Sequence, residues 1–290
     1  MADVQFCSVG AQAPLGTERF LVQDGAVLFS GTTGATPVAG AGTRMMWIPA
    51  KAAFRAGIVT GTAWDDANIG TYTAAFGTDC QATATQAFAW GSGSIASGQA
   101  SFAGGYSCTA SGVFSVSLGN FALASLAAQF ARAGNKFTAQ GDAQTSDLRV
   151  MKSSVDNAVT ELTLDGTAPG AGVRIAIVSG KSYDFIIQGV TRCTAGTNIN
   201  TSATWYITGT IKNVGGTTSL VGSPMNLLST ALFSTAAWTP KAADAALATA
   251  TLTPTADDVN DALILTFVGV TGVSANTFHT VASVYLTEVG

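Results

Sequence analysis

The sequence predicts an all-β protein, in which a β-roll or solenoid of 14-residue repeats is followed by an antiparallel β-sandwich of jelly-roll type. Three observations predict it. Residues recur every 14 positions in the middle of the chain, large and small side chains alternate within each repeat, and eight strand-like runs follow the last repeat. Alternation with period two is typical of strands. We divide the chain into an N-terminal β region (1–60), a repeat domain (61–137) and a C-terminal sandwich domain (138–290).

The N-terminal region is expected to form a small β unit. Residues 20–34, FLVQDGAVLFSGTTG, hold two apolar runs on either side of an Asp-Gly pair at positions 24 and 25, which is a strong hairpin signal. Residues 43–57, TRMMWIPAKAAFRAG, combine an apolar strand-like run with Pro49 and a short basic segment. The sequence therefore predicts a few short strands that lead into the repeats.

Four columns of residues define the repeat and stay in register over four copies. They comprise a glycine (Gly77, Gly91, Gly105, Gly119), an alanine (Ala82, Ala96, Ala110, Ala124), a hydroxyl residue (Thr83, Ser97, Ser111, Ser125) and a large apolar residue (Phe88, Phe102, Val116, Phe130). A repeat of this length can hold two strands of about five residues and two tight turns with glycine at the corners. Each repeat is then one rung of a narrow roll. A flexible linker rich in Ala, Gly and Ser is the alternative, but linkers do not keep aromatic columns in register.

The column formed by Phe88, Phe102, Val116 and Phe130 is expected to face outward. Small residues suit an interior too thin for bulky side chains, so the large ones stand on one outer side as an apolar ridge that needs a partner. Three rolls with their ridges on a common axis would bury it, while neighbouring rungs pair by strand hydrogen bonds. The sequence therefore predicts a homotrimer with these four residues at its interface, and leaves open which face of the roll lines the three-fold axis.

The last part of the chain predicts strands separated by Gly, Asn, Asp and Pro clusters, which favours an antiparallel sandwich. The eight runs are LRVMK, VTELTLDG, GVRIAIVSG, YDFIIQGVTRC, ATWYITGTIKN, ATATLTP, DALILTFVGV and HTVASVYLTEV. Only the alanines of residues 241–250 favour a helix, and Pro240 and Pro254 flank them.

Composition limits the partners. The chain is 47% apolar but only 10% charged, against roughly 25% in ordinary soluble domains, so we expect much of its surface to be covered by other copies. A net charge of −4 without a basic cluster argues against nucleic acid. No export signal and no apolar stretch of membrane-spanning length is recognisable, so we expect folding in a cytoplasm and no membrane insertion. Cys7, Cys80, Cys108 and Cys193 lie far apart without zinc spacing, so free thiols and no cofactor are expected.

Catalytic signatures are sparse, so the sequence predicts that the chain is not an enzyme. The single His279 lies in FHTVASVYL without a nucleophile elbow, and a structural imidazole at a strand edge is favoured. Two acidic clusters occur, Asp65-Asp66 and the group Asp257, Asp258 and Asp261 in TADDVNDA. Adjacent Asp residues on an extended chain face opposite sides, so turn capping is favoured over a catalytic pair. A metal at the second cluster stays open, although its spacing does not match the DxDxDG pattern of calcium loops.

Aromatic residues of the last domain are candidates for receptor binding, because their rings could stack on sugars. The candidates are Trp205, Tyr206 and Trp238. Neighbouring side chains in ATWYITGT face opposite sides, so Trp205 and Tyr206 cannot both lie in one core, and one is expected to be exposed or at a subunit contact. Core packing or interface burial is the alternative for each of them.

The repeat phrases IASGQASFAGG and TASGVFSVSLG resemble the head repeats of trimeric autotransporter adhesins, which also occur in bacteriophage tail fibres and related virion proteins. The resemblance covers residues 72–134. An exported adhesin would carry a signal peptide and a membrane-barrel anchor, so the phage relatives fit better. The resemblance implies that residues 1–60 dock onto other virion proteins, and that the last domain, as a fibre tip, contacts a host-surface glycan or protein.

The leading hypothesis is therefore a virion protein, assembled in the host cytoplasm, that acts as a trimeric tail fibre or spike in host attachment. A trimeric capsid decoration or cement protein, a glycan-cleaving tailspike and a cellular adhesin are the alternatives. The sequence leaves open the host, its receptor, and the choice between tail and capsid.

Overall fold

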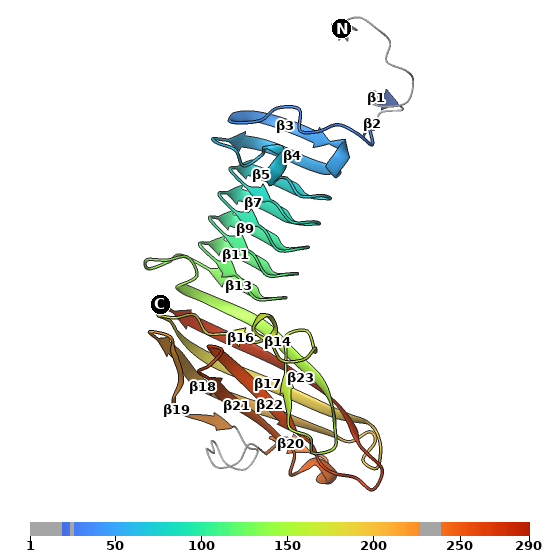
Figure 1. Ribbon diagram of the computed structural model, residues 1–290, viewed down its shortest axis with the longest axis vertical. Helices are drawn as coiled ribbons and strands as arrows, with labels where there is room; N and C mark the ends of the chain where they lie inside the picture. Colours follow the sequence, from blue (N-terminus) through green and yellow to red (C-terminus); the bar gives the residue numbers. More distant parts are fainter. Residues whose placement is uncertain (1–18, 24–25, 227–238) are drawn as a thin grey trace, which may run out of the picture.

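Strands make up almost the whole of the computed structural model, which describes residues 19–23, 26–226 and 239–290. The chain forms an elongated body, in which a ladder of stacked rungs leads from the N-terminal strands to a broader β domain (Figure 1). The helical segments of the described residues are four single 3-10 turns, Pro49–Lys51, Asp66–Asn68, Ala171–Val173 and Ala245–Leu247. The prediction of an all-β protein is confirmed. Among the described residues, no helix has the length and apolarity needed to span a membrane.

The first strands form two hairpins. β1 (Arg19–Gln23) pairs antiparallel with β2 (Ala26–Ser30), which confirms the hairpin expected around the Asp-Gly pair. β3 (Gly42–Ile48) pairs antiparallel with β4 (Ala53–Val59) across the first 3-10 turn. β4 also pairs in parallel with the first rung, so this second hairpin continues directly into the solenoid.

The repeats form a β-solenoid of about four turns, as predicted. One column of parallel strands contains β5 (Ala74–Thr78), β7 (Phe88–Ser92), β9 (Phe102–Tyr106), β11 (Val116–Asn120) and β13 (Phe130–Ala133). A second column contains β6 (Gln81–Ala82), β8 (Ile95–Ala96), β10 (Thr109–Ala110) and β12 (Leu123–Ala124).

The expectation of two five-residue strands in each rung is wrong, because the second strand has only two residues. The remaining residues form the corners, and one residue at each corner has a left-handed backbone conformation. Gln86, Ala100 and Phe114 have φ angles of 63°, 52° and 58° at one recurring corner. Each donates its N–H to the carbonyl oxygen of the residue 15 positions earlier, at 2.9 Å. The corners are therefore fixed by backbone hydrogen bonds between successive turns.

The interior of the solenoid is filled by the smallest side chains. Fully buried alanines and serines line both walls: Ala75, Ala89, Ala103, Ser117 and Ala131 on the long strands, and Ala82, Ala96, Ala110 and Ala124 on the short ones. The glycine column marks the closest approach of successive rungs. A Cβ added at Gly105, where φ is +116°, would lie 2.0 Å from the carbonyl oxygen of Gly119. No side chain fits between these rungs.

A buried arginine closes the N-terminal end of the solenoid. Arg55 lies on β4 opposite Ala75 and is fully buried. Its guanidinium donates to the carbonyl oxygens of Phe54, Thr73 and Ala82, at 2.8, 3.3 and 3.0 Å. Burial lowers the pKa of Arg55 to about 10. The side chain therefore satisfies carbonyl groups that would otherwise point into an empty end.

The C-terminal domain continues the sheet of the solenoid. β13 pairs antiparallel with β14 (Ala143–Val155), which pairs with β23 (Thr277–Val289). Beyond β23 follow β17 (Ser182–Ala195), β18 (Ser202–Val214) and β19 (Thr217–Asn226), with β20 (Ala242–Ala243) beside β18. A second sheet contains β15 (Thr160–Leu162), β16 (Ile175–Ala176), β21 (Thr251–Asp257) and β22 (Ala262–Val268).

One hydrophobic core joins the two sheets of this domain. Trp205 from β18 and Phe278 from β23 contact Phe267 of β22, with ring centroids 5.9 and 5.7 Å apart. All eight predicted runs contain strand residues. β19 was not predicted, because Gly222 and Pro224 interrupt its pattern; it lies at the edge of the sheet, where a proline is tolerated.

Candidate functional site

The outer face of the large sheet carries the apolar column that the repeat predicts. Strand register places Phe88, Phe102, Val116 and Phe130 directly beside one another, and each is half-buried. The rings of Phe88 and Phe102 are stacked with centroids 5.0 Å apart. The side chains are therefore not enclosed within the fold of a single copy.

A second column, which the alternation of large and small residues put on the same face but which was not assigned to the interface, widens this apolar face. Phe76 and Trp90 point outward two positions along the same strands and are 36% and 44% exposed. The indole of Trp90 lies over Gly104, where an added Cβ would be 2.0 Å from its nitrogen. Met45 (65% exposed) and Trp47 (37%) extend the surface onto β3. Residue types change from copy to copy in this column, so a search for recurring residues misses it.

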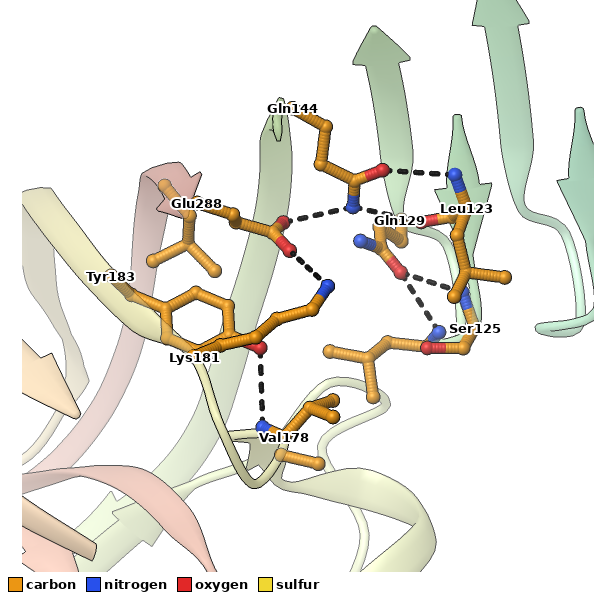
Figure 2. A pocket seen from close by; sticks show the side chains of 11 residues that line it. Leu123, Ser125, Gln129, Gln144, Val178, Lys181, Tyr183 and Glu288 are labelled. Carbon is orange, nitrogen blue, oxygen red and sulfur yellow. Dashed lines mark hydrogen bonds and ion pairs between the residues drawn. The ribbon is translucent and has the colours of Figure 1, made fainter. Parts of the chain in front are cut away.

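A polar junction closes the C-terminal end of the solenoid (Figure 2). The side-chain amide of Gln144 accepts the N–H of Leu123 at 2.8 Å and donates to its carbonyl oxygen at 2.9 Å. Gln129 accepts the N–H groups of Ser125 and Leu126 at 2.8 and 2.9 Å. Gln144 thus binds the backbone of β12 where a further rung would pair, and Gln129 binds the two residues that follow β12.

Glu288 is the buried carboxylate of this junction. It accepts hydrogen bonds from Ser146 and from Gln144, and Lys181 Nζ lies 3.7 Å away. Burial raises the pKa of Glu288 above its ordinary value. The cavity beside it has a volume of about 30 Å³, which is room for a single water molecule. A sugar does not fit there, so we assign the junction a structural role.

The acidic clusters bind backbone and side-chain donors of neighbouring loops. Asp66 accepts hydrogen bonds from Thr36 and forms a 3.1 Å ion pair with Lys51; the Thr36 bonds, and then Lys51, hold its pKa below the ordinary value. Asp65 accepts the N–H of Gly40 at 2.6 Å. In the hairpin between β21 and β22, Asp257 accepts the N–H groups of residues 259 and 260.

The other two acids of that hairpin both bind Thr218. Asp258 accepts its N–H at 2.6 Å and Asp261 accepts its hydroxyl at 2.8 Å. Over the described part of the chain, no three His, Cys, Asp or Glu side chains are grouped as metal ligands. These contacts are typical of turn and loop stabilisation.

His279 and the cysteines lie in separate environments. His279 is exposed on β23, between Ser153 of β14 and Arg192 of β17, so its expected position at a strand edge is wrong. Cys80, Cys108 and Cys193 are buried free thiols. Cys7 lies outside the described residues.

The structure separates the three receptor-binding candidates. Trp205 is only 2% exposed and packs against Phe267, so its ring is out of reach of a ligand and its assignment is corrected. Tyr206 is half-buried on the outer face, with Lys241 Nζ 5.8 Å from its ring centroid. Trp238 lies outside the described residues.

Comparison with known proteins gives weak structural likenesses, among them two phage tailspike proteins. No protein-family model matches the chain, and no curated protein matches it. The tailspike protein gp49 of Acinetobacter baumannii bacteriophage Fri1, a capsular polysaccharide depolymerase, is 9% identical over 81% of this chain and 46% of its own, with a TM-score of 0.26. The tailspike of A. baumannii phage AM24 is 10% identical over 75% of this chain and 40% of its own, with a TM-score of 0.22.

The chain spans less than half the length of these two tailspikes. Both are phage tailspike proteins, and the first is a capsular polysaccharide depolymerase. The expectation that the present chain is not an enzyme is contradicted by that comparison, and we withdraw it.

Proposed function

We propose that the chain is a bacteriophage virion protein that assembles as a homotrimeric tail fibre or spike, with the outer face of the solenoid on the three-fold axis. The apolar outer face of the solenoid carries this proposal. It runs from Trp47 and Phe54 past Phe88 to Phe130, on a chain with only 10% charged residues. A solitary copy would leave this face in water.

Burial of this face supplies a driving force that grows with the number of rungs. Completely burying a large apolar side chain stabilises by roughly 1.5–3 kcal/mol. Phe76, Trp90 and the half-buried column therefore gain on the order of 1 kcal/mol each when another copy covers them. A straight column is complementary to an identical straight column, because both repeat with the same rung spacing.

The two ends of the chain would then have different tasks. The resemblance of the repeats to phage fibre proteins supports docking of residues 1–60 onto other virion proteins, and contact of the C-terminal domain, as a sandwich-type tip, with a host-surface glycan or protein. Tyr206 is the receptor candidate that remains on the described surface.

Light scattering during size-exclusion chromatography tests the assembly. Three chains of 29.2 kDa give about 88 kDa. We expect Phe102→Asp to abolish this species, because three carboxylates would meet at a dry axis. Ile95→Asp is the matched control, since Ile95 is a half-buried large apolar residue on the short strand β8, in the other wall of the same solenoid. An intact trimer of Phe102→Asp would contradict the proposal.

Antibody labelling of intact particles tests the location. Label at the tail supports a fibre or spike, and label over the shell would replace it with a capsid decoration protein.

A further inference from the structure

The outer face of the sheet continues without a break into the C-terminal domain, but its chemistry changes there. Phe130 of β13 pairs with Asp147 of β14, which pairs with Tyr285 of β23. Buried and accessible residues alternate along β14, so Asp147 and Arg149 share the outward face. The apolar column therefore ends in a carboxylate with an arginine two residues further along the same strand.

Within the described part of the chain, the side chains of Asp147 and Arg149 make no hydrogen bond and no ion pair, although their backbone belongs to the β14 ladder. The four ion pairs of the described residues join other side chains, for example Arg174 with Glu161 at 2.7 Å. Arg132, the other cation near the end of the column, already lies over the ring of Phe130, 5.3 Å from its centroid. Asp147 and Arg149 are thus two opposite charges at the end of the column whose side chains have no hydrogen bond or ion pair within their own copy, over the described residues.

A depression of about 320 Å³ lies beside these two side chains. It is lined by Ala128, Phe130, Asp147, Leu148, Arg149, Ser283 and Tyr285. The volume exceeds that of a single water by a wide margin, so a long side chain from outside can enter it. A carboxylate and two hydroxyl groups line it, and these groups suit a guanidinium.

In a three-fold assembly, residues on the axis meet their equivalents in the other copies. Away from the axis each contact joins two different parts of the same surface, and the third copy closes the ring. The rungs stack along the long axis, and β14 crosses that axis obliquely (Figure 1). Asp147 and Arg149 are displaced sideways by about 7 Å along their strand. One copy can therefore offer the arginine where its neighbour offers the carboxylate.

Resting on the proposed trimer, we infer that Arg149 of each copy enters the depression of the next copy and pairs with Asp147 there, and that this pair fixes the register of the assembly. The solenoid specifies register only weakly, since a neighbour displaced by one rung, about 4.8 Å, still lays phenylalanine against phenylalanine. Asp147 and Arg149 lie beyond the last repeat and meet in one register alone. Fixing register is the best-supported role of isolated polar pairs in apolar interfaces.

Charge reversal tests the pair. We expect Asp147→Arg and Arg149→Asp each to raise the dissociation constant of the trimer at least about tenfold, and the double variant to recover most of the loss. Lys212→Asp is the control for charge, because it places the same change on β18 of the same sheet, remote from the column. Native mass spectrometry over a dilution series gives the constants. Salt at 1 M should weaken the wild-type trimer and strengthen the single variants, in which it screens the repulsion between like charges.

A cysteine at position 116 reports the register directly. In register, Val116 of one copy faces Val116 of the next, so Val116→Cys should crosslink on oxidation in the wild-type and double-reversal backgrounds, and much less in the single reversals. If both single-reversal variants form trimers with the same dissociation constant and the same crosslinking yield as the wild type, the charged pair is refuted and the trimer is not. A monomeric wild type would overturn both.

Discussion

The substitution Gly105→Ala tests the geometry of the solenoid most directly. The added methyl group would lie 2.0 Å from the carbonyl oxygen of Gly119 and 2.9 Å from its carbonyl carbon, at a φ angle of +116° that L-residues avoid. Hydrogen bonds hold the rungs on either side in register, with Phe102 N donating to Ser115 O at 2.9 Å. The neighbouring backbone therefore cannot move away without breaking part of the ladder.

The expected loss of stability has two parts. Backbone strain at such a φ angle costs roughly 1–3 kcal/mol, and forcing a methyl group into a packed position costs roughly 1–3 kcal/mol more. We therefore expect the free energy of unfolding to fall by about 2–6 kcal/mol.

Gly93→Asn is the matched control for this substitution. Its φ angle of +64° suits asparagine, and the nearest atom to an added Cβ is Ser107 Oγ at 3.4 Å. Asp79, Ser107 and Phe121 already occupy equivalent corners at φ angles of 51°, 49° and 63°. We expect a change below about 1 kcal/mol.

Urea unfolding followed by circular dichroism, at several protein concentrations because assembly adds to stability, measures both variants. Equal unfolding midpoints for Gly105→Ala and Gly93→Asn would refute the close approach of the rungs.

Three further predictions concern the closed ends of the solenoid. Arg55→Ala should lower the free energy of unfolding by roughly 2–5 kcal/mol, because it leaves a cavity and unpaired carbonyl groups; an unchanged urea midpoint would contradict this. Gln144→Ala should lower the free energy of unfolding by roughly 1–3 kcal/mol and speed hydrogen exchange at the Leu123 amide, which loses its acceptor. An exchange rate equal to that of the wild type would contradict this. Burial would raise the pKa of Asp142, but the N–H groups of residues 139, 138 and 137 outweigh it and hold that pKa at about 2. Its stabilisation is therefore present above pH 3.8 and lost as the pH falls toward 2, and Asp142→Asn should remove this part of the acid sensitivity in melts across that range.

The repeat could be predicted because the space available at each of its key positions permits only one kind of residue. Only glycine permits the contact at Gly105, and only a very small side chain fits at Ala96. The division of each rung into a long and a short strand could not be predicted. Its corners are occupied by residues such as Gln86 and Phe114, whose types do not mark turns, and hydrogen bonds to the previous turn fix their conformation.

The candidate surface was predicted in part. The alternation of side chains put Phe88 and Trp90 on one face, but only the column of Phe88 was assigned to the interface. The position of Trp90 holds phenylalanine, glycine and leucine in the other copies, so it did not stand out as a recurring column. The burial of Trp205 depends on which face of β18 meets the second sheet. Tertiary packing decides which face of β18 is buried, and the alternation of residues along the strand does not predict it.

The caps at the two ends have a consequence for the dimensions of the molecule. Within the solenoid, the hydrogen bonds of the Arg55 side chain reach only the first turn and those of the Gln144 side chain only the last short strand. The turns between them share an interior of very small side chains. Duplication of a unit such as residues 95–108 would lengthen the shaft by one strand spacing, about 4.8 Å, and leave both caps unaltered. The reach of this protein can therefore change in whole steps through gain or loss of 14 codons, without any redesign of its ends.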